Sequence, residues 1–89
     1  MLKKSLIITN KLGLHARAAA KLVNEANHFA SEIIITCNNK QANGKSIMGV
    51  MMLAARKGTA IDLSINGDDE EAALIALENL INNKFGEPC

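Results

Sequence analysis

One segment in the second half of the chain constrains the possible folds more than any other. Residues 59–67 read TAIDLSING, in which the apolar residues Ile61, Leu63 and Ile65 alternate with polar ones. Apolar side chains at every second position predict a β-strand with one buried face and one face in water. Antiparallel sheets accept this arrangement, with helices packed over only one face. The rest of the chain must therefore supply further strands and a layer of helices.

Similar patterns predict the other elements. Apolar residues from Ala16 to about Phe29 recur at helical spacing and form one buried stripe. A second helix is predicted from Asp68 to about Ile81, because it opens with an acidic run, which is favoured at a helix N-terminus. Further strands are expected at residues 4–9, 32–37 and 40–44, and a short helix at residues 46–58. The order is βαββαβα, so the expected fold class is α+β, with helices on one face of an antiparallel sheet.

The length of the chain permits a single hydrophobic core. With 89 residues, of which 48% are hydrophobic, we expect one domain spanning residues 1–89. Residues 84–89 are expected to form a frayed C-terminal tail. Cys37 lies in an apolar strand pattern and is predicted to fill the core, and Cys89 ends the tail. Neither cysteine has the spacing of a metal or redox motif, so both are expected to be reduced thiols.

Charge and composition argue against several classes of function. The formal net charge is +1 and the only aromatic residues are two phenylalanines, which offers neither a basic patch nor a stacking surface for nucleic acid. The basic pair Lys3 and Lys4 precedes only a short apolar run, so no signal peptide or membrane helix is predicted. We therefore expect a cytoplasmic protein that binds neither nucleic acid nor membrane and that needs no metal or other cofactor.

A histidine opens the first predicted helix. If that helix begins at Ala16, His15 lies at its N-cap, where the first backbone N–H groups, including that of Ala16, have no partner within the helix. These donors, the helix dipole and the Arg17 guanidinium together suit a phosphate anion. The same positive field favours a neutral, nucleophilic imidazole, so this segment predicts phosphoryl acceptance by His15. The spacing alone also fits a histidine that only caps the helix beside a solvated arginine.

The short helix carries a second candidate site. Ser46 is expected to be its N-cap, and capping alone would account for a serine at this position. The residues that follow are apolar nearly all the way round, although a helix of this length on a small sheet can bury only one side. Part of this set fills the core, and the rest suggests an exposed surface for protein partners. The predicted docking residues are Ala20, Ile47, Met48, Met51 and Met52.

Three segments carry a resemblance to a known family. GLHARAAAKLV, NGKSIMGVMMLAARKGT and INGDDEEAALIALENLI together resemble the histidine-containing phosphocarrier (HPr) family of the bacterial phosphoenolpyruvate-dependent sugar phosphotransferase system. The similarity runs in order from the first predicted strand to about Ile81. The resemblance implies an open-faced β-sandwich with strand order 1-4-2-3 and three helices on one side.

The resemblance also implies roles for three residues. His15 would accept a phosphoryl group on Nδ1 from enzyme I and pass it to the IIA domains of sugar permeases. Arg17 would help to hold the phosphoryl group, and Ser46 would be the target of HPr kinase/phosphorylase. The implied protein is a monomeric carrier with a covalent phosphohistidine, not an enzyme. Phosphorylation of Ser46 is expected to weaken docking to enzyme I, and we consider a transcriptional regulator as a partner of the modified form.

Two departures from the family pattern affect these expectations. Ala18 stands where many members have a proline that pre-forms the first helical turn, so a looser active-site loop is expected. Asn24 and Asn27 replace basic residues further along the helix, which weakens charge steering toward a partner. The alternative function is therefore a mainly regulatory paralogue, of the nitrogen-related or carbon-control branch, rather than a carrier for sugar uptake.

Two other classes of function stay open as rivals. A small hydrolase would need a second catalytic group beside His15. The only other histidine, His28, is expected near the end of the first helix, where it complements the helix dipole. A nucleic-acid module can share the order of elements, but the near-neutral charge opposes it.

Overall fold

Strands and helices follow one another in the predicted order βαββαβα in the computed structural model, which describes residues 1–87. The strands are β1 (Leu2–Ile7), β2 (Glu32–Cys37), β3 (Lys40–Asn43) and β4 (Ala60–Asn66), and the helices are α1 (Ala16–Ala26), α2 (Ile47–Met52) and α3 (Glu70–Asn82). A single 3-10 turn, η1 (Lys84–Gly86), follows α3.

The strands form one antiparallel sheet in the order β1-β4-β2-β3, which is the order that the family resemblance implied. The alternating segment found in the sequence is the central strand β4. Ile65 of β4 lies opposite Ile33 of β2, and Leu63 lies opposite Ile35. These four side chains are fully buried, so paired strands present their apolar residues on the same inner face.

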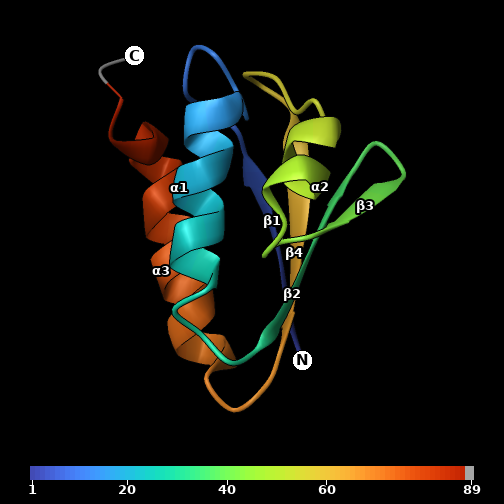
Figure 1. Cartoon of the computed structure of the whole chain (residues 1–89), viewed down its shortest axis with the longest axis vertical. Helices are drawn as coiled ribbons and strands as arrows, with labels where there is room; N and C mark the ends of the chain where they lie inside the picture. Colours follow the sequence, from blue (N-terminus) through green and yellow to red (C-terminus); the bar gives the residue numbers. More distant parts are fainter. Residues whose placement is uncertain (88–89) are drawn as a thin grey trace.

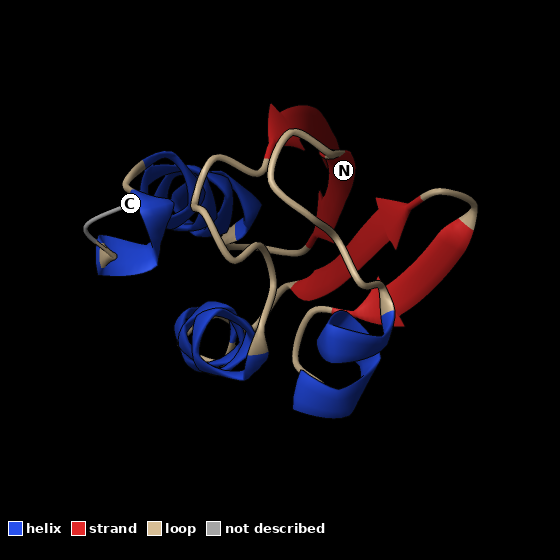
Figure 2. Cartoon of the chain, turned by 90° about the horizontal axis from the view of Figure 1, so that it is seen from above, coloured by secondary structure: helices blue, strands red, loops and turns tan. Residues whose placement is uncertain are grey.

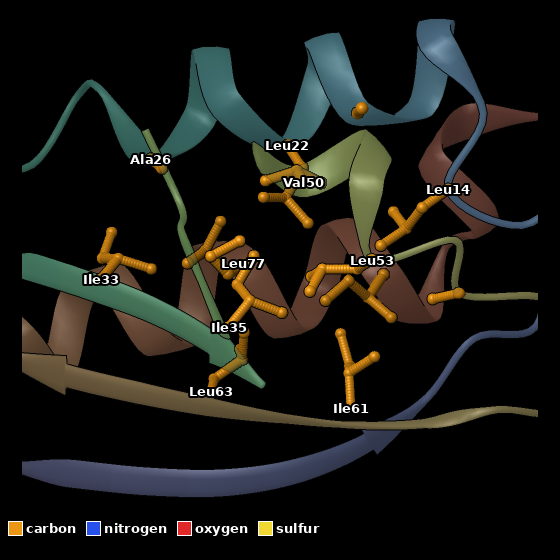
Figure 3. Packing of buried hydrophobic residues seen from close by; sticks show 14 of the residues in the cluster. Leu14, Leu22, Ala26, Ile33, Ile35, Val50, Leu53, Ile61, Leu63 and Leu77 are labelled. Atoms are coloured by element: carbon orange, nitrogen blue, oxygen red, sulfur yellow. The ribbon is translucent and has the colours of Figure 1, made fainter. Parts of the chain in front are cut away.

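The helices form a second layer over one face of this sheet, and the other face is left open (Figure 2). Between the layers, Leu22 of α1, Val50 of α2 and Leu77 of α3 meet Ile35 and Leu63 of the strands (Figure 3). Burial of these side chains supplies the main favourable free energy of folding. The open-faced α+β sandwich expected from the sequence is confirmed.

The bounds of the strands agree closely with the sequence pattern. Strand β2 begins and ends where it was predicted. The hairpin from β2 to β3 turns at Asn38 and Asn39, whose φ angles of 50° and 68° suit a type I′ turn. Strand β1 begins and ends two residues earlier than the predicted residues 4–9, and Leu2 pairs with Ile65 at the far end of β4.

Two helices are shorter than predicted. Helix α1 ends at Ala26. Helix α2 ends at Met52 instead of continuing to Gly58, because Ala54 adopts a left-handed conformation with a φ angle of 52° and reverses the chain. Residues 56–57 therefore lie beyond the helix and do not complement the negative end of its dipole. An alanine gives no sequence signal for this conformation, which glycine and asparagine normally supply.

The C-terminal segment is packed where it was expected to fray, and this corrects the prediction for residues 84–87. Lys84 and Phe85 adopt φ angles of 55° and 56° and turn the chain back toward α1. Phe85 is buried in the core, with 1% of its surface exposed. Lys21 of α1 donates a hydrogen bond to the carbonyl oxygen of Phe85 at 2.7 Å. The sequence did not reveal this docking, because one aromatic residue in a polar segment has no periodicity.

Candidate functional site

The loop between β1 and α1 is tied down before it reaches His15. Gly13 has a φ angle of +66°, and a Cβ at this position would lie 2.4 Å from the carbonyl oxygen of Ala55. Leu14 donates its backbone N–H to the same oxygen at 2.9 Å. The buried Asn10 side chain closes the loop from within, because its Nδ2 donates to the Gly13 carbonyl oxygen at 2.8 Å. Two segments distant in sequence thus fix the start of α1.

His15 is the N-cap of α1, as predicted. Its backbone is extended, with φ −73° and ψ 178°, and its side chain makes no capping hydrogen bond. The first turn holds no acidic residue, so no carboxylate of α1 itself competes for the amide donors at Ala16 and Arg17. Arg17 is exposed, and none of the ion pairs within residues 1–87 involves it. The helix begins at Ala16 without a proline at position 18, where Ala18 is fully buried.

A carboxylate that sequence reasoning missed lies against the His15 ring. The Oε2 atom of Glu87 is 2.5 Å from His15 Nε2, and Oε1 accepts a hydrogen bond from Asn10 Nδ2 at 3.0 Å. Burial raises the pKa of Glu87, but the hydrogen bonds from His15 and Asn10 and the nearby positive charge of Lys21 act in the opposite direction, and the pKa is lowered. The carboxylate is therefore ionised at neutral pH.

The second histidine does not join this site. His28 lies near the end of α1, as predicted, but just beyond the C-cap Asn27, so the last turn of the helix itself holds no basic residue. Its Nδ1 is 2.9 Å from Oε2 of Glu25, and its side chain is 70% exposed. His28 therefore pairs with a local carboxylate at a surface position.

The exposed side of α2 forms an apolar surface beside α1. Ser46 caps α2 as predicted, because its Oγ accepts the N–H of Gly49 at 3.1 Å. Val50 is fully buried and Leu53 nearly so, which accounts for the part of the helix that fills the core. We define the docking patch as the exposed residues Ile47, Met48, Met51 and Met52 with the half-buried Ala20 of α1. The C-terminal end of α2, the start of α1 and η1 lie at the same end of the molecule (Figure 1).

No metal centre or membrane-spanning helix is found in the described part of the chain. Residues 1–87 contain no group of three or more His, Cys, Asp or Glu side chains placed to hold a metal ion. Among these residues, no helix is long and apolar enough to cross a bilayer. Cys37 is buried and fills the core as predicted, and Cys89 lies outside the described residues.

Comparisons with known proteins identify a family. The family model "PTS HPr component phosphorylation site" matches residues 2–83. The phosphocarrier protein HPr of Neisseria meningitidis is 58% identical over 87 residues, which cover 98% of each chain. The crystal structure of an HPr from Thermoanaerobacter tengcongensis has a TM-score of 0.96 and 48% identity, and the match covers 100% of both chains. Crh of Bacillus subtilis, described as a swapped dimer, has a TM-score of 0.75 and 39% identity, with 94% and 97% covered.

The open-faced sandwich with a histidine at the start of α1 defines a class, the small phosphocarrier proteins. The chain belongs to the HPr family of the phosphotransferase system. The resemblance that the sequence motifs indicated is thereby confirmed for the family and for its fold.

Proposed function

We propose that this protein accepts a phosphoryl group from phospho-enzyme I on His15 and passes it to IIA domains of the sugar phosphotransferase system. The observation that carries the proposal is the position of His15 at the start of α1, beside backbone N–H groups that its side chain leaves uncapped. Membership of the HPr family supports it. The protein acts in the cytoplasm as a carrier with a covalent phosphohistidine, and not as an enzyme that turns over a substrate.

The residues around His15 suit each part of the transfer. The lone pair of Nδ1 forms the new N–P bond as the bond between phosphorus and enzyme I breaks. The N–H of Ala16 offers a donor to the phosphoryl oxygens at the positive end of α1. The Arg17 guanidinium supplies charge-assisted hydrogen bonds, which explains a cation in the first turn, where it otherwise opposes the helix dipole.

Mass spectrometry after mixing with phosphoenolpyruvate and enzyme I tests this assignment. We expect an acid-labile mass increase of one phosphoryl group in the unmodified sequence and in His28→Ala, and none in His15→Ala. Phosphorylation of His15→Ala at the normal rate would show that the acceptor is elsewhere. Repeated turnover of generic phosphate esters would favour a hydrolase.

Partner docking is assigned to the docking patch on α2 and α1. Met48 and Met52 are 69% and 71% exposed, and methionine side chains adapt to more than one partner surface. Met48→Asp should weaken association with enzyme I and IIA domains without lowering the melting temperature. Ile75→Asp on α3 is the matched control, because Ile75 is also an exposed apolar residue, at 60%, but lies outside the patch. Equal losses in both variants would contradict the assignment.

Ser46 is proposed as a regulatory phosphorylation site for HPr kinase/phosphorylase. A phosphate on Oγ would add about two negative charges next to the docking patch, which must lose water when enzyme I covers it. The dianion also creates a contact for a basic partner, such as a transcriptional regulator. Enzyme I affinity and thermal stability should be compared for the unmodified protein, the Ser46 phosphoprotein and Ser46→Asp. Weaker binding with unchanged stability is expected, and unchanged affinity or loss through unfolding would each contradict the proposal.

A mainly regulatory role is the second candidate. Asn24 and Asn27 are exposed on and after α1, at positions where basic residues would steer an acidic partner. Under this alternative, a purified IIA domain of a sugar permease would accept phosphate slowly, while the Ser46 phosphoprotein would bind a regulator tightly. Fast transfer to such a IIA domain would favour the carrier for sugar uptake. We expect a monomer in either role, in contrast to the swapped dimer described for Crh, and light scattering would measure the mass in solution.

A further inference from the structure

The segment after α3 is fixed so that one carboxylate reaches the start of α1. Phe85 anchors the segment in the core, and its carbonyl oxygen accepts a hydrogen bond from Lys21 of α1. Glu87 lies two residues after Phe85, and only 12% of its side chain is exposed. The position of its carboxylate is therefore set by contacts to the core and to α1.

The carboxylate of Glu87 has a separate partner for each oxygen. Oε2 lies 2.5 Å from His15 Nε2, and Oε1 accepts from Asn10 Nδ2 at 3.0 Å. Asn10 is fully buried and also donates to the carbonyl oxygen of Gly13. One rigid amide thus joins the loop before α1 to the carboxylate that holds the ring, which restricts rotation of the imidazole.

This contact determines which ring nitrogen carries the proton. An ionised carboxylate can only accept hydrogen bonds, so the short contact requires a hydrogen on Nε2 of His15. A neutral imidazole with that hydrogen has its lone pair on Nδ1. The partner of one ring nitrogen therefore selects the reactivity of the other, as it does for histidines that bind metals or act as bases.

We propose that Glu87 is a positioning residue that holds His15 in the tautomer with hydrogen on Nε2 and presents the Nδ1 lone pair to the incoming phosphoryl group. This inference rests on the proposed function of His15. The N–P bond forms at Nδ1 while the donor atom of enzyme I keeps the electron pair of the bond that breaks. The Nε2 hydrogen stays in place, and the positive charge that develops on the ring is balanced by the carboxylate. Transfer to a IIA domain reverses these changes.

The test compares Glu87→Gln with Glu78→Gln. The first variant keeps the length of the side chain but removes its charge, and its amide can donate or accept, so it no longer selects one tautomer. Glu78 pairs with Lys4 of β1 at 3.4 Å, so the second variant makes the same chemical change at a carboxylate with a different partner. The measurements are ¹⁵N chemical shifts of the His15 ring, the rate of phosphorylation by enzyme I and the melting temperature.

In the parent protein and in Glu78→Gln, the ¹⁵N shifts should show hydrogen on Nε2 and a bare Nδ1. In Glu87→Gln the shifts should move toward a mixture of tautomers, and phosphorylation should slow by about tenfold or more. Unchanged shifts in Glu87→Gln, or changed shifts with an unchanged rate, would overturn the positioning role. If enzyme I phosphorylates neither the parent nor the variants, the proposed function of His15 fails, and the tautomer measurement still reports on Glu87 alone.

Discussion

Gly13 shows how a single residue determines the geometry at His15. The loop needs a left-handed residue here, and the added Cβ of an alanine would press against the Ala55 carbonyl oxygen. Gly13→Ala should therefore lower the free energy of unfolding by about 2 kcal/mol or more, measured by denaturant unfolding. Gly58→Ala is the control, because Gly58 also has a positive φ of +87° but open space around its Cβ position. Gly58→Ala should cost about 1 kcal/mol, and an equal loss in both variants would exclude the steric contribution.

Arg17 is expected to contribute to the rate of phosphoryl transfer, whereas His15 can still be phosphorylated without it. In Arg17→Ala the backbone donors at the start of α1 remain, so His15 should still accept phosphate while the transfer to a IIA domain becomes slower. Lys21→Ala removes a neighbouring cation of α1 that is already engaged with the Phe85 carbonyl oxygen. Rapid-quench measurement of both steps should show the larger loss in Arg17→Ala. Equal rates in the parent and Arg17→Ala would remove the guanidinium from the mechanism.

At the scale of single elements, the short helix α2 depends on its N-cap, Ser46. Ser46→Ala removes the acceptor for the Gly49 N–H and should reduce the free energy of unfolding by about 1 kcal/mol. Ser46→Asp restores an acceptor oxygen and should recover most of this loss. Thermal and denaturant unfolding of both variants measure the effect. Unchanged stability of Ser46→Ala would mean that packing, including that of Val50 and Leu53, holds α2 in place without the cap.

The sequence predicted those elements whose pattern is local. The alternation in β4 and the start of α1 depend on neighbours along the chain, so both were predicted correctly. The end of α2 was wrong, because Ala54 adopts a glycine-like conformation that its residue type does not indicate. A left-handed conformation at an alanine is maintained only by the surrounding structure.

The candidate site also contains residues that a local sequence pattern can predict and one residue that it cannot. The positions of His15, Arg17 and Ser46 at the starts of helices agree with the sequence pattern, and their roles stay predictions. Glu87 was missed because it meets His15 across 72 residues of sequence, within a segment expected to fray. The burial of Phe85 and the hydrogen bonds from Lys21 and Asn10 bring the two together, and these contacts are properties of the complete fold.

At the scale of the whole molecule, carboxylates link separate parts of the chain and make stability depend on pH. Hydrogen bonds from the side chain of Ser31 and the N–H of Ala30 lower the pKa of Asp69 below its ordinary value of 3.8. The N–H of Gly67 lowers the pKa of Glu70 below 4.5. A carboxyl group with a lowered pKa in the folded state stabilises the fold above its ordinary pKa, and this contribution is lost as the pH falls through the lowered value.

The free energy of unfolding should therefore stay nearly constant between pH 7 and about pH 5 and fall progressively below that range. In Asp69→Asn the fall should be smaller, because one of the groups that take up protons is missing. Denaturant unfolding at a series of pH values provides the measurement, and Asp68→Asn is the control, since Asp68 is exposed at the neighbouring position. If the free energy of unfolding had the same pH dependence in the parent and in Asp69→Asn, ionisation of Asp69 would not contribute to the loss of stability at low pH.

The chain starts at one end of its 33 Å long axis, and η1 lies at the other end beside the start of α1 (Figure 1). A sensor surface coupled through the amino group of Met1 would therefore present His15 and the docking patch to a partner in solution. Coupling through the carboxyl-terminal side of Glu87 would instead crowd the imidazole with the linker. The two immobilised forms make a matched pair for binding measurements, in which the second serves as the reference with an obstructed site.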